Sequence, residues 1–450
     1  MRETWYNLLL PLTVPILGIR LWWKGRTEPA YRKRIGERFA HVNPAEDTRA
    51  LQGCIWFHTV SAGEAIAAEP LIRAVMERFP ERSLLITSMT PAGSTELKRR
   101  LGDAVSHRYA PYDYPWVVRR FFEQMQPRLL VLVETELWPN WLASCRARDI
   151  PVALVNARMS ERSARGYRRL GRLGRNLFQH LDWVGCQFPE HATRFCQLGV
   201  MQQRVSVCGS LKYDVKLPAD LKEQAKKIKK NLPSPPFTRS PALSQSPNQS
   251  SGDQVGRAES GSERPIWIAA STHAGEEEIV LRAQRHLLQA YPTLLLILAP
   301  RHPRRCAELA RQARRAGFQV MGSQDQRPGI AEVLIVETMG RLPFYYGVAD
   351  MAFIGGSLVP RGGHNMIEAA ACGLPLVMGP SDYNFEQIAQ SFSQAGCLAR
   401  VTDAEALACT LQRWLADPEV RQTAGAAARR MVAQNTGTTA RLLEGISALL

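Results

Sequence analysis

The sequence predicts an α/β protein made of two domains, each built around a parallel sheet. From residue 54 onward, short apolar runs alternate with longer mixed segments, the pattern of parallel strands joined by crossover helices. This pattern stops over residues 233–264, which are rich in Ser, Pro, Gln and Gly, and then returns. The length of 450 residues is sufficient for two domains of ordinary size. Paired domains of this kind bind ligands at the carboxyl ends of their strands, in the cleft between them.

The composition is that of a globular protein with a basic bias. Its 45% hydrophobic and 22% charged residues exclude a fibrous or polytopic membrane chain. The net charge of +16 favours an anionic partner, which is nucleic acid, an acidic membrane surface or a phosphorylated substrate. The nine cysteines form no C-x-x-C pair and no cluster with histidine at zinc spacing. We therefore expect reduced thiols in a cytoplasmic protein.

Residues 1–26 are expected to form an N-terminal membrane anchor. The apolar stretch from Leu8 to Ile19 is shorter than the ~20 residues of a comfortable span, and Pro11 and Pro15 weaken it as a regular helix. No A-x-A cleavage pattern follows it, so a signal peptide is disfavoured. The alternatives left open are spanning the membrane, lying in it, and packing on the protein's own core. Basic residues that would keep the body of the protein cytoplasmic are Arg20, Lys24, Arg26, Arg32, Lys33 and Arg34.

Two α/β domains follow, joined by a linker or insertion at residues 233–264 that is expected to be disordered. Within residues 27–232, the first domain, strands are expected at 55–60, 83–87, 129–133, 152–155 and 183–186. Within residues 265–450, the second domain, strands are expected at 266–270, 294–299, 333–336, 351–354 and 376–378.

Two acidic motifs follow strands of the first domain. Ser61-Ala62-Gly63-Glu64 precedes a helix, so Glu64 is either a residue of the cleft or a helix-capping glutamate. Glu134 and Glu136 point to one face if their strand continues, and one of them must then meet a cation or hold a raised pKa. A buried structural ion pair explains the second motif as well as catalysis does.

A run of arginines spaced by 4, 3, 4 and 3 residues predicts one basic stripe on a helix. Mutual repulsion favours an external anion such as lipid phosphate as the neutralising partner, and a solvated helix face is the alternative. The stripe consists of Arg158, Arg162, Arg165, Arg169 and Arg172.

The second domain carries four glycine-, histidine- and arginine-rich segments at strand ends, which together predict an anion site. Glu368, three residues after Asn365, falls on the same helical face and can accept ribose hydroxyls. Neither a P-loop nor a G-x-G-x-x-G fingerprint occurs, so a P-loop NTPase and a dinucleotide enzyme are disfavoured. The segments are 270–276, 300–305, 338–340 and 355–370.

The chain resembles the 3-deoxy-D-manno-octulosonic acid (Kdo) transferases, membrane-associated glycosyltransferases of lipopolysaccharide inner-core assembly. The resemblance rests on S-x-G-E at Glu64, E-T-E-L-W-P-N from Glu134, Asn156-Ala157-Arg158, Gly209-Ser210-Leu211-Lys212, Ser271-Thr272-His273, Pro300-Arg301-His302-Pro303 and G-G-H-N-x-x-E ending at Glu368. It implies two Rossmann-like domains facing a cleft, the GT-B type of glycosyltransferase. It also implies a CMP-Kdo donor bound mainly by the second domain, a lipid A precursor bound by the first, and a location at the cytoplasmic side of the cell inner membrane.

The resemblance also implies roles for single residues. Glu64 becomes the general base, and Glu134 and Lys212 stabilise the transition state. At the position after Met339-Gly340 the family often has an acidic residue, whereas this chain has Arg341. The contacts to CMP fall on Ser271, Thr272, His273, Pro300, Arg301, Met339, Gly340, Arg341, Gly363, Asn365, Met366, Ile367 and Glu368.

A single base without a second carboxylate nucleophile predicts one displacement with inversion, without metal or cofactor. Such a base needs a raised carboxylate pKa, which removal of water from Glu64 can supply. Another nucleotide-sugar enzyme of the same fold, a UDP-sugar transferase or an epimerase, is the closest alternative. Nucleic-acid binding fits the charge of +16 less well, because the basic residues gather beside the N-terminus and on one helix without interleaved aromatics.

Overall fold

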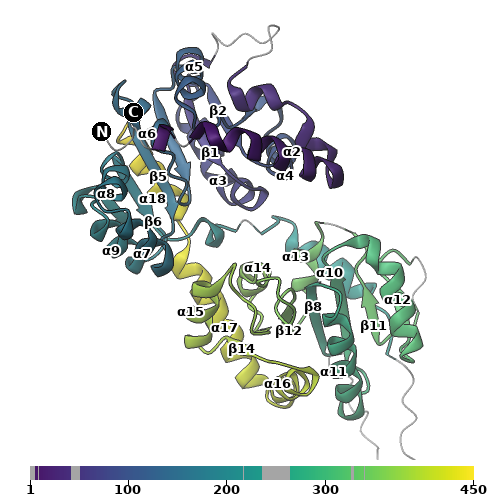
Figure 1. Ribbon diagram of the computed structural model, residues 1–450. Helices are drawn as coiled ribbons and strands as arrows, with labels where there is room; N and C mark the ends of the chain where they lie inside the picture. Colours follow the sequence, from purple (N-terminus) through teal and green to yellow (C-terminus); the bar gives the residue numbers. More distant parts are fainter. Residues whose placement is uncertain are drawn as a thin grey trace, which may run out of the picture. The chain divides into compact units, whose positions relative to one another are not determined.

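The computed structural model describes residues 6–8, 10–41, 51–215, 217–235, 264–325, 329–338 and 340–450. The chain forms two compact units, Met1–Asp214 with Asn435–Leu450 and Val215–Gln434. Each unit is an α/β structure around a seven-stranded sheet (Figure 1).

The sheet of unit 1 is parallel throughout, in the order β3-β2-β1-β4-β5-β6-β7. Chain order reverses between β1 and β4, so the carboxyl ends of these two strands form the switch point where such sheets bind ligands. The strands are β1 Ile55–Thr59, β2 Leu84–Ser88, β3 Ser106–Tyr109, β4 Leu129–Val133, β5 Val152–Ala157, β6 Trp183–Cys186 and β7 Val205–Val207.

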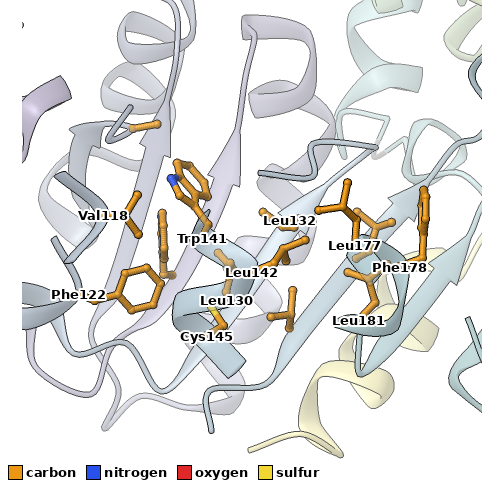
Figure 2. Packing of buried hydrophobic residues seen from close by; sticks show 14 of the residues in the cluster. Val118, Phe122, Leu130, Leu132, Trp141, Leu142, Cys145, Leu177, Phe178 and Leu181 are labelled. Carbon is orange, nitrogen blue, oxygen red and sulfur yellow. The ribbon is translucent and has the colours of Figure 1, made fainter. Parts of the chain in front are cut away.

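Helices cover both faces of this sheet, and its central strands are therefore buried along their whole length. On one face Trp141 and Leu142 lie beside Leu130 and Leu132 of β4, and Phe178 and Leu181 extend the same buried cluster beside Leu177 (Figure 2). The helices of unit 1 are α2 Val14–Thr27, α3 Ala62–Arg78, α4 Pro91–Leu101, α5 Pro115–Met125, α6 Pro139–Arg146, α7 Glu161–Arg169, α8 Arg172–Gln179, α9 Pro189–Gln197 and α18 Thr438–Ser447.

The C-terminal helix α18 belongs to unit 1, whereas the sequence placed all of residues 265–450 in the second domain. Leu442 and Ile446 of α18 are fully buried in the core that α3 also covers. Asp214 accepts hydrogen bonds from the backbone N–H groups of Gly437 (2.7 Å) and Thr438 (3.3 Å), which fixes the start of the helix. An apolar helix pattern does not reveal which of two sheets the helix covers, and the boundary prediction was wrong for this reason.

The sheet of unit 2 is also parallel, in the order β10-β11-β9-β8-β12-β13-β14, and its chain order reverses between β8 and β12. Its strands are β8 Ile266–Thr272, β9 Leu295–Pro300, β10 Val320–Gly322, β11 Val333–Ile335, β12 Met351–Ile354, β13 Leu376–Met378 and β14 Leu398–Arg400. Its helices are α10 Leu221–Lys230, α11 Glu276–Ala290, α12 Cys306–Arg315, α13 Leu342–Tyr346, α14 Ile367–Ala371, α15 Glu386–Gln394, α16 Ala404–Ala416 and α17 Pro418–Asn435.

The expected linker is only partly described. Ser234, near its start, forms an isolated parallel bridge with Ile330 of unit 2. Residues 236–263 lie outside the described residues, so the prediction of disorder there stays a prediction.

The apolar stretch from Leu8 to Ile19 does not form one continuous helix. A 3-10 turn at Leu10–Thr13 precedes α2, and Pro15 lies in the first turn of α2, where the missing N–H is harmless. In the part of the chain that the structure describes, no helix combines the length and the apolar character needed to cross a bilayer.

The arginine run is not one helix, so this part of the prediction was wrong. Arg158 lies in the loop after β5, α7 ends at Arg169, and Gly171 with φ 58° separates α7 from α8. Glu161, at the start of α7, forms ion pairs with Arg165, Arg168 and Arg194. The helix breaks at Gly171 because glycine readily adopts a left-handed backbone. The regular spacing of the arginines gave no indication of this break.

Candidate active site

Glu64 lies in the first turn of α3, directly after the central strand β1. Ser61 is the N-cap of this helix, and the Glu64 N–H donates to its Oγ (3.4 Å). In return, the Glu64 carboxylate accepts hydrogen bonds from the Val60 N–H (2.7 Å) and the Ser61 hydroxyl (2.9 Å). The capping role considered from the sequence is therefore present, and it holds the carboxylate at the switch point of the sheet.

The pKa of Glu64 is raised to about 7, mainly by burial and in smaller part by the nearby carboxylates of Glu134 and Glu136. The hydrogen bonds from Val60 and Ser61 oppose this shift without cancelling it. A carboxylate with a pKa near the working pH is suited to accept a proton in general base catalysis.

Glu134 follows β4 and has a left-handed backbone with φ 61°. The strand ends at Val133, so the expected continuation that would bring Glu134 and Glu136 to one face does not occur. Burial raises the pKa of Glu136, and Glu134 adds to this shift. A left-handed conformation in a residue other than glycine stores strain, and such strain concentrates at functional sites.

Lys212 lies in the short helical turn Leu211–Tyr213 after β7 and interacts with Glu134. Burial lowers the pKa of Lys212, Glu134 opposes this effect, and Arg158 adds to it. Charged groups from the carboxyl ends of β1, β4, β5 and β7 therefore act on one another at one edge of the sheet.

Asn156 holds this edge together and was not singled out from the sequence as a site residue. Its Oδ1 accepts the Leu211 N–H (3.1 Å), and its backbone carbonyl accepts from Gln187 Nε2 (2.8 Å). Its φ of 51° is left-handed, a conformation that asparagine tolerates better than most residues. The sequence feature that could have indicated this role is an asparagine at the end of an apolar strand.

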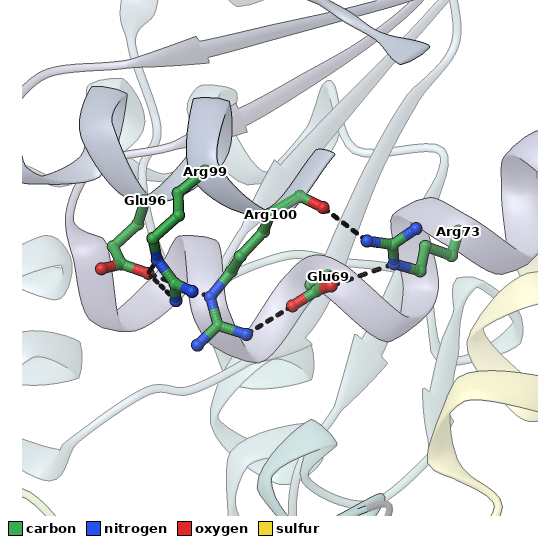
Figure 3. Close-up of polar contacts among 5 residues, drawn as sticks. All are labelled: Glu69, Arg73, Glu96, Arg99 and Arg100. Carbon is green, nitrogen blue, oxygen red and sulfur yellow. Dashed lines mark hydrogen bonds and ion pairs between the residues drawn. The ribbon is translucent and has the colours of Figure 1, made fainter. Parts of the chain in front are cut away.

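An ion-pair network fixes the helix that carries Glu64 against its neighbour α4 (Figure 3). Arg100 of α4 donates to Glu69 of α3 (2.6 Å) and to Glu96 of its own helix (3.0 Å). Arg73 donates to the other oxygen of Glu69 (2.9 Å) and to the Arg100 carbonyl (2.5 Å). The position of α3 relative to α4 is thus set by charge-assisted bonds as well as by the core.

In unit 2, Glu276 organises the loops at the switch point between β8 and β12. Its fully buried carboxylate accepts four backbone N–H groups. Oε2 receives those of His273 (2.9 Å) and Gly356 (2.7 Å), and Oε1 receives those of Ser357 (2.9 Å) and Leu358 (2.9 Å). The sequence showed Glu276 beside the expected anion site but gave no sign of this role.

His273 and His364 form a stacked pair above these loops. Their Nε2 atoms are 2.8 Å apart, and their ring centroids are separated by 5.1 Å. Burial lowers the pKa of His364 to about 4, with further contributions from His273, Arg301 and His302. The His364 imidazole is therefore neutral at pH 7, and burial also lowers the pKa of His273.

Positive charge at this edge of unit 2 comes from arginine. Arg301 follows β9, its N–H bonds to the Thr272 carbonyl (2.9 Å), and both Arg301 and Arg361 act electrostatically on His273. Ser271, at the β8 end, is left-handed with φ 58°. A cationic edge with two polarisable imidazoles suits a phosphate.

The glycine-rich segment before α14 contains left-handed backbone at Gly362 and Gly363. Gly363 has φ 70°, and a Cβ there would lie 2.6 Å from Met378 Cε. Asn365 Oδ1 accepts the Ile367 N–H (3.1 Å) at the start of α14. Met366 and Ile367 are fully buried, so neither side chain is exposed at the surface of the site.

The remaining expected donor residues lie on neighbouring elements. Pro300 ends β9, and Gly340 and Arg341 precede α13, with Gly340 left-handed at φ 78°. Burial raises the pKa of Glu368 in α14. Met339 lies outside the described residues.

Comparisons with known proteins agree with this arrangement. A family model described as 3-deoxy-D-manno-octulosonic-acid transferase (kdotransferase) matches residues 33–215, and one for glycosyl transferases group 1 matches residues 329–431. The 3-deoxy-D-manno-octulosonic acid transferase of Haemophilus influenzae is 33% identical over 98% of this chain and 96% of its own. That of Bordetella pertussis is 35% identical over 98% of each chain.

Solved structures resemble the fold at lower sequence identity. A UDP-GlcNAc 2-epimerase from Neisseria meningitidis has a TM-score of 0.56 at 11% identity, over 88% of this chain and 99% of its own. A glycosyltransferase from Rickettsia africae has a TM-score of 0.51 at 12% identity, over 88% and 98%. The two parallel seven-stranded sheets and these neighbours are those of the GT-B fold. The protein is therefore a glycosyltransferase of this fold and belongs to the 3-deoxy-D-manno-octulosonic acid transferase family.

Proposed function

We propose that the protein transfers Kdo from CMP-Kdo to a lipid A precursor, lipid IVA, in lipopolysaccharide core biosynthesis. Membership of the family supports the sugar and the pathway. The observation that carries the mechanism is the half-buried Glu64 carboxylate, with a pKa of about 7, beside Glu134 and Lys212.

The reaction is a direct displacement with inversion. The acceptor hydroxyl gives its proton to Glu64 while its oxygen forms a bond to the anomeric carbon of Kdo, and the bond from that carbon to the CMP phosphate oxygen breaks. The anomeric carbon gains positive charge, which the carboxylate of Glu134 stabilises. The phosphate leaves with negative charge, which Arg301 and Lys212 stabilise.

Residues of unit 2 are proposed to hold the CMP part of the donor. Support comes from the arginines at the β9 end and the left-handed glycines before α14, in loops that the Glu276 carboxylate holds in place. Glu368, at the first turn of α14, is proposed to accept ribose hydroxyls.

The N-terminal helix is proposed to attach the protein to the cytoplasmic face of the inner membrane. Ile19, Trp22 and Trp23 of α2 expose more than half of their surface, next to the basic residues Arg20 and Lys24. This combination favours a helix lying in the interface of an anionic bilayer. The arginines of the loop after β5 and of α7 and α8 are proposed to meet acceptor or lipid phosphates.

The activity is tested by mass spectrometry of tetra-acylated lipid A precursor after incubation with the full chain and CMP-Kdo. A mass gain of one or more Kdo units is expected, and CMP but not UDP should suppress it. No gain from folded, membrane-bound protein would refute the function. Suppression by UDP rather than CMP would indicate a different nucleotide sugar as donor.

A further inference from the structure

An apolar groove of about 460 Å³ lies in unit 1, between the N-terminal segment and the carboxyl edge of the sheet. One wall is formed by Leu10, Leu17 and Leu21, which lie on the inner face of the N-terminal segment. The opposite wall is formed by Met89, Tyr114 and Trp138. Its size is within the range of ligand-binding pockets.

Specific hydrogen bonds hold the two walls of this groove in place. The Tyr6 hydroxyl donates to Asp113 Oδ2 (2.8 Å), and the hydroxyls of Thr13 and Tyr114 are 2.9 Å apart. Leu10 and Leu17 also pack partly against the core of unit 1. The N-terminal segment is therefore fixed to the rest of unit 1 by hydrogen bonds and apolar packing, and these contacts define the groove.

The groove is connected to the candidate base. Val60 lines it, and the Val60 N–H donates to Glu64 Oε2 (2.7 Å). Trp138, which also lines it, is two residues after Glu136 in the loop that follows β4. A ligand in the groove therefore lies beside the group that would deprotonate the acceptor.

The charges at the groove fit an anionic amphiphile. Arg20 and Lys24 line it, and the carboxylate of Asp113 is engaged by Tyr6 and by the N–H groups of α6. Beyond the groove, the same helix exposes Ile19 (67%) and Trp23 (70%) to the surroundings. A molecule with a phosphate head and an apolar tail satisfies both the cations and the walls.

We infer that this groove binds one acyl chain of the lipid acceptor and thereby selects acylated acceptors. The inference rests on the proposed function, because it requires a lipid as the acceptor. Each methylene buried in an apolar site adds about fourfold to affinity. Shortening the bound chain by two carbons should therefore raise the acceptor KM about tenfold or more.

The test compares two acceptors in detergent micelles, one with full-length chains and one with its chains removed, using the full-length protein. The native protein should prefer the acylated acceptor. Leu17→Trp fills the groove, so it should raise the KM for the acylated acceptor about tenfold and leave kcat/KM for the deacylated acceptor unchanged. The latter reaction also shows that the variant is folded.

Gly18→Trp is the matched control, since nothing lies within 4 Å of a Cβ at this neighbouring position and Gly18 does not line the groove. It should leave the preference unchanged. Transfer that ignores the acyl chains, or a preference that Leu17→Trp leaves intact, would overturn the inference while the proposed function stands. Absence of Kdo transfer to either acceptor would overturn both.

Discussion

The carboxylate of Glu64 caps a helix and also has a pKa of about 7. The two properties are compatible because the hydrogen bonds from Val60 and Ser61 fix the carboxylate, while burial and neighbouring carboxylates keep its proton affinity high. The same motif thus serves the structure and the proposed chemistry.

The pH dependence of transfer follows from this pKa. Below about pH 7 the Glu64 carboxyl is protonated and cannot accept a proton, so kcat/KM should fall about tenfold per pH unit there and level off above it. Because its pKa in the folded protein is raised from 4.5, the group makes folding less favourable as pH rises from about 4.5 to 7. A kcat/KM that is constant between about pH 5 and 8 would argue against Glu64 as the base.

Glu276→Gln should weaken donor binding. The amide NH₂ group of glutamine would face two of the four backbone N–H groups that the carboxylate now accepts, and each unpaired buried N–H costs about 1–3 kcal/mol. The KM for CMP-Kdo should rise about tenfold or more, with the acceptor KM unchanged.

Glu278→Gln, an exposed change on the same helix, is the control and should have no effect. A purely structural role for Glu276 would instead reduce the amount of active enzyme without changing the donor KM. Steady-state kinetics with varied donor separates the two.

At the scale of elements, the ten strands expected from apolar runs all form, and the four strands that were not expected are the two edge strands of each sheet. All four, β3, β7, β10 and β14, are partly exposed, so they lack the continuous apolar run of a central strand. Sequence reasoning therefore found the buried middle of each sheet and missed its borders.

The network between α3 and α4 should contribute measurably to stability. Arg100 joins Glu69 to Glu96 and is 29% exposed, so Arg100→Ala should lower the free energy of unfolding by about 1 kcal/mol, and less at high salt. Arg99 provides the control, because it is 59% exposed and, in the part of the chain that the structure describes, its ion pair is with Glu96 of its own helix. Arg99→Ala should stay within about 0.5 kcal/mol of the native protein in urea unfolding. Equal effects of both changes would contradict the bridging role.

At the scale of the whole molecule, two parallel sheets and the strand ends that carry the motifs were predictable because they follow from local apolar patterns. Glu64, Glu134 and Lys212 were placed through a family resemblance, and the structure brings their charges together at one edge of unit 1. The roles of Asn156 and Glu276 depend on bonds to loops remote in sequence, which no local pattern shows.

The most direct test of the account is single-turnover transfer of Kdo from CMP-Kdo to lipid A precursor by native protein, Glu64→Gln and Glu77→Gln. Glu77 is exposed on the same helix as Glu64 and serves as the matched control. The account predicts that Glu64→Gln slows transfer by about 10²–10⁴-fold and Glu77→Gln leaves it unchanged. A folded Glu64→Gln protein that transfers Kdo at the native rate would contradict it.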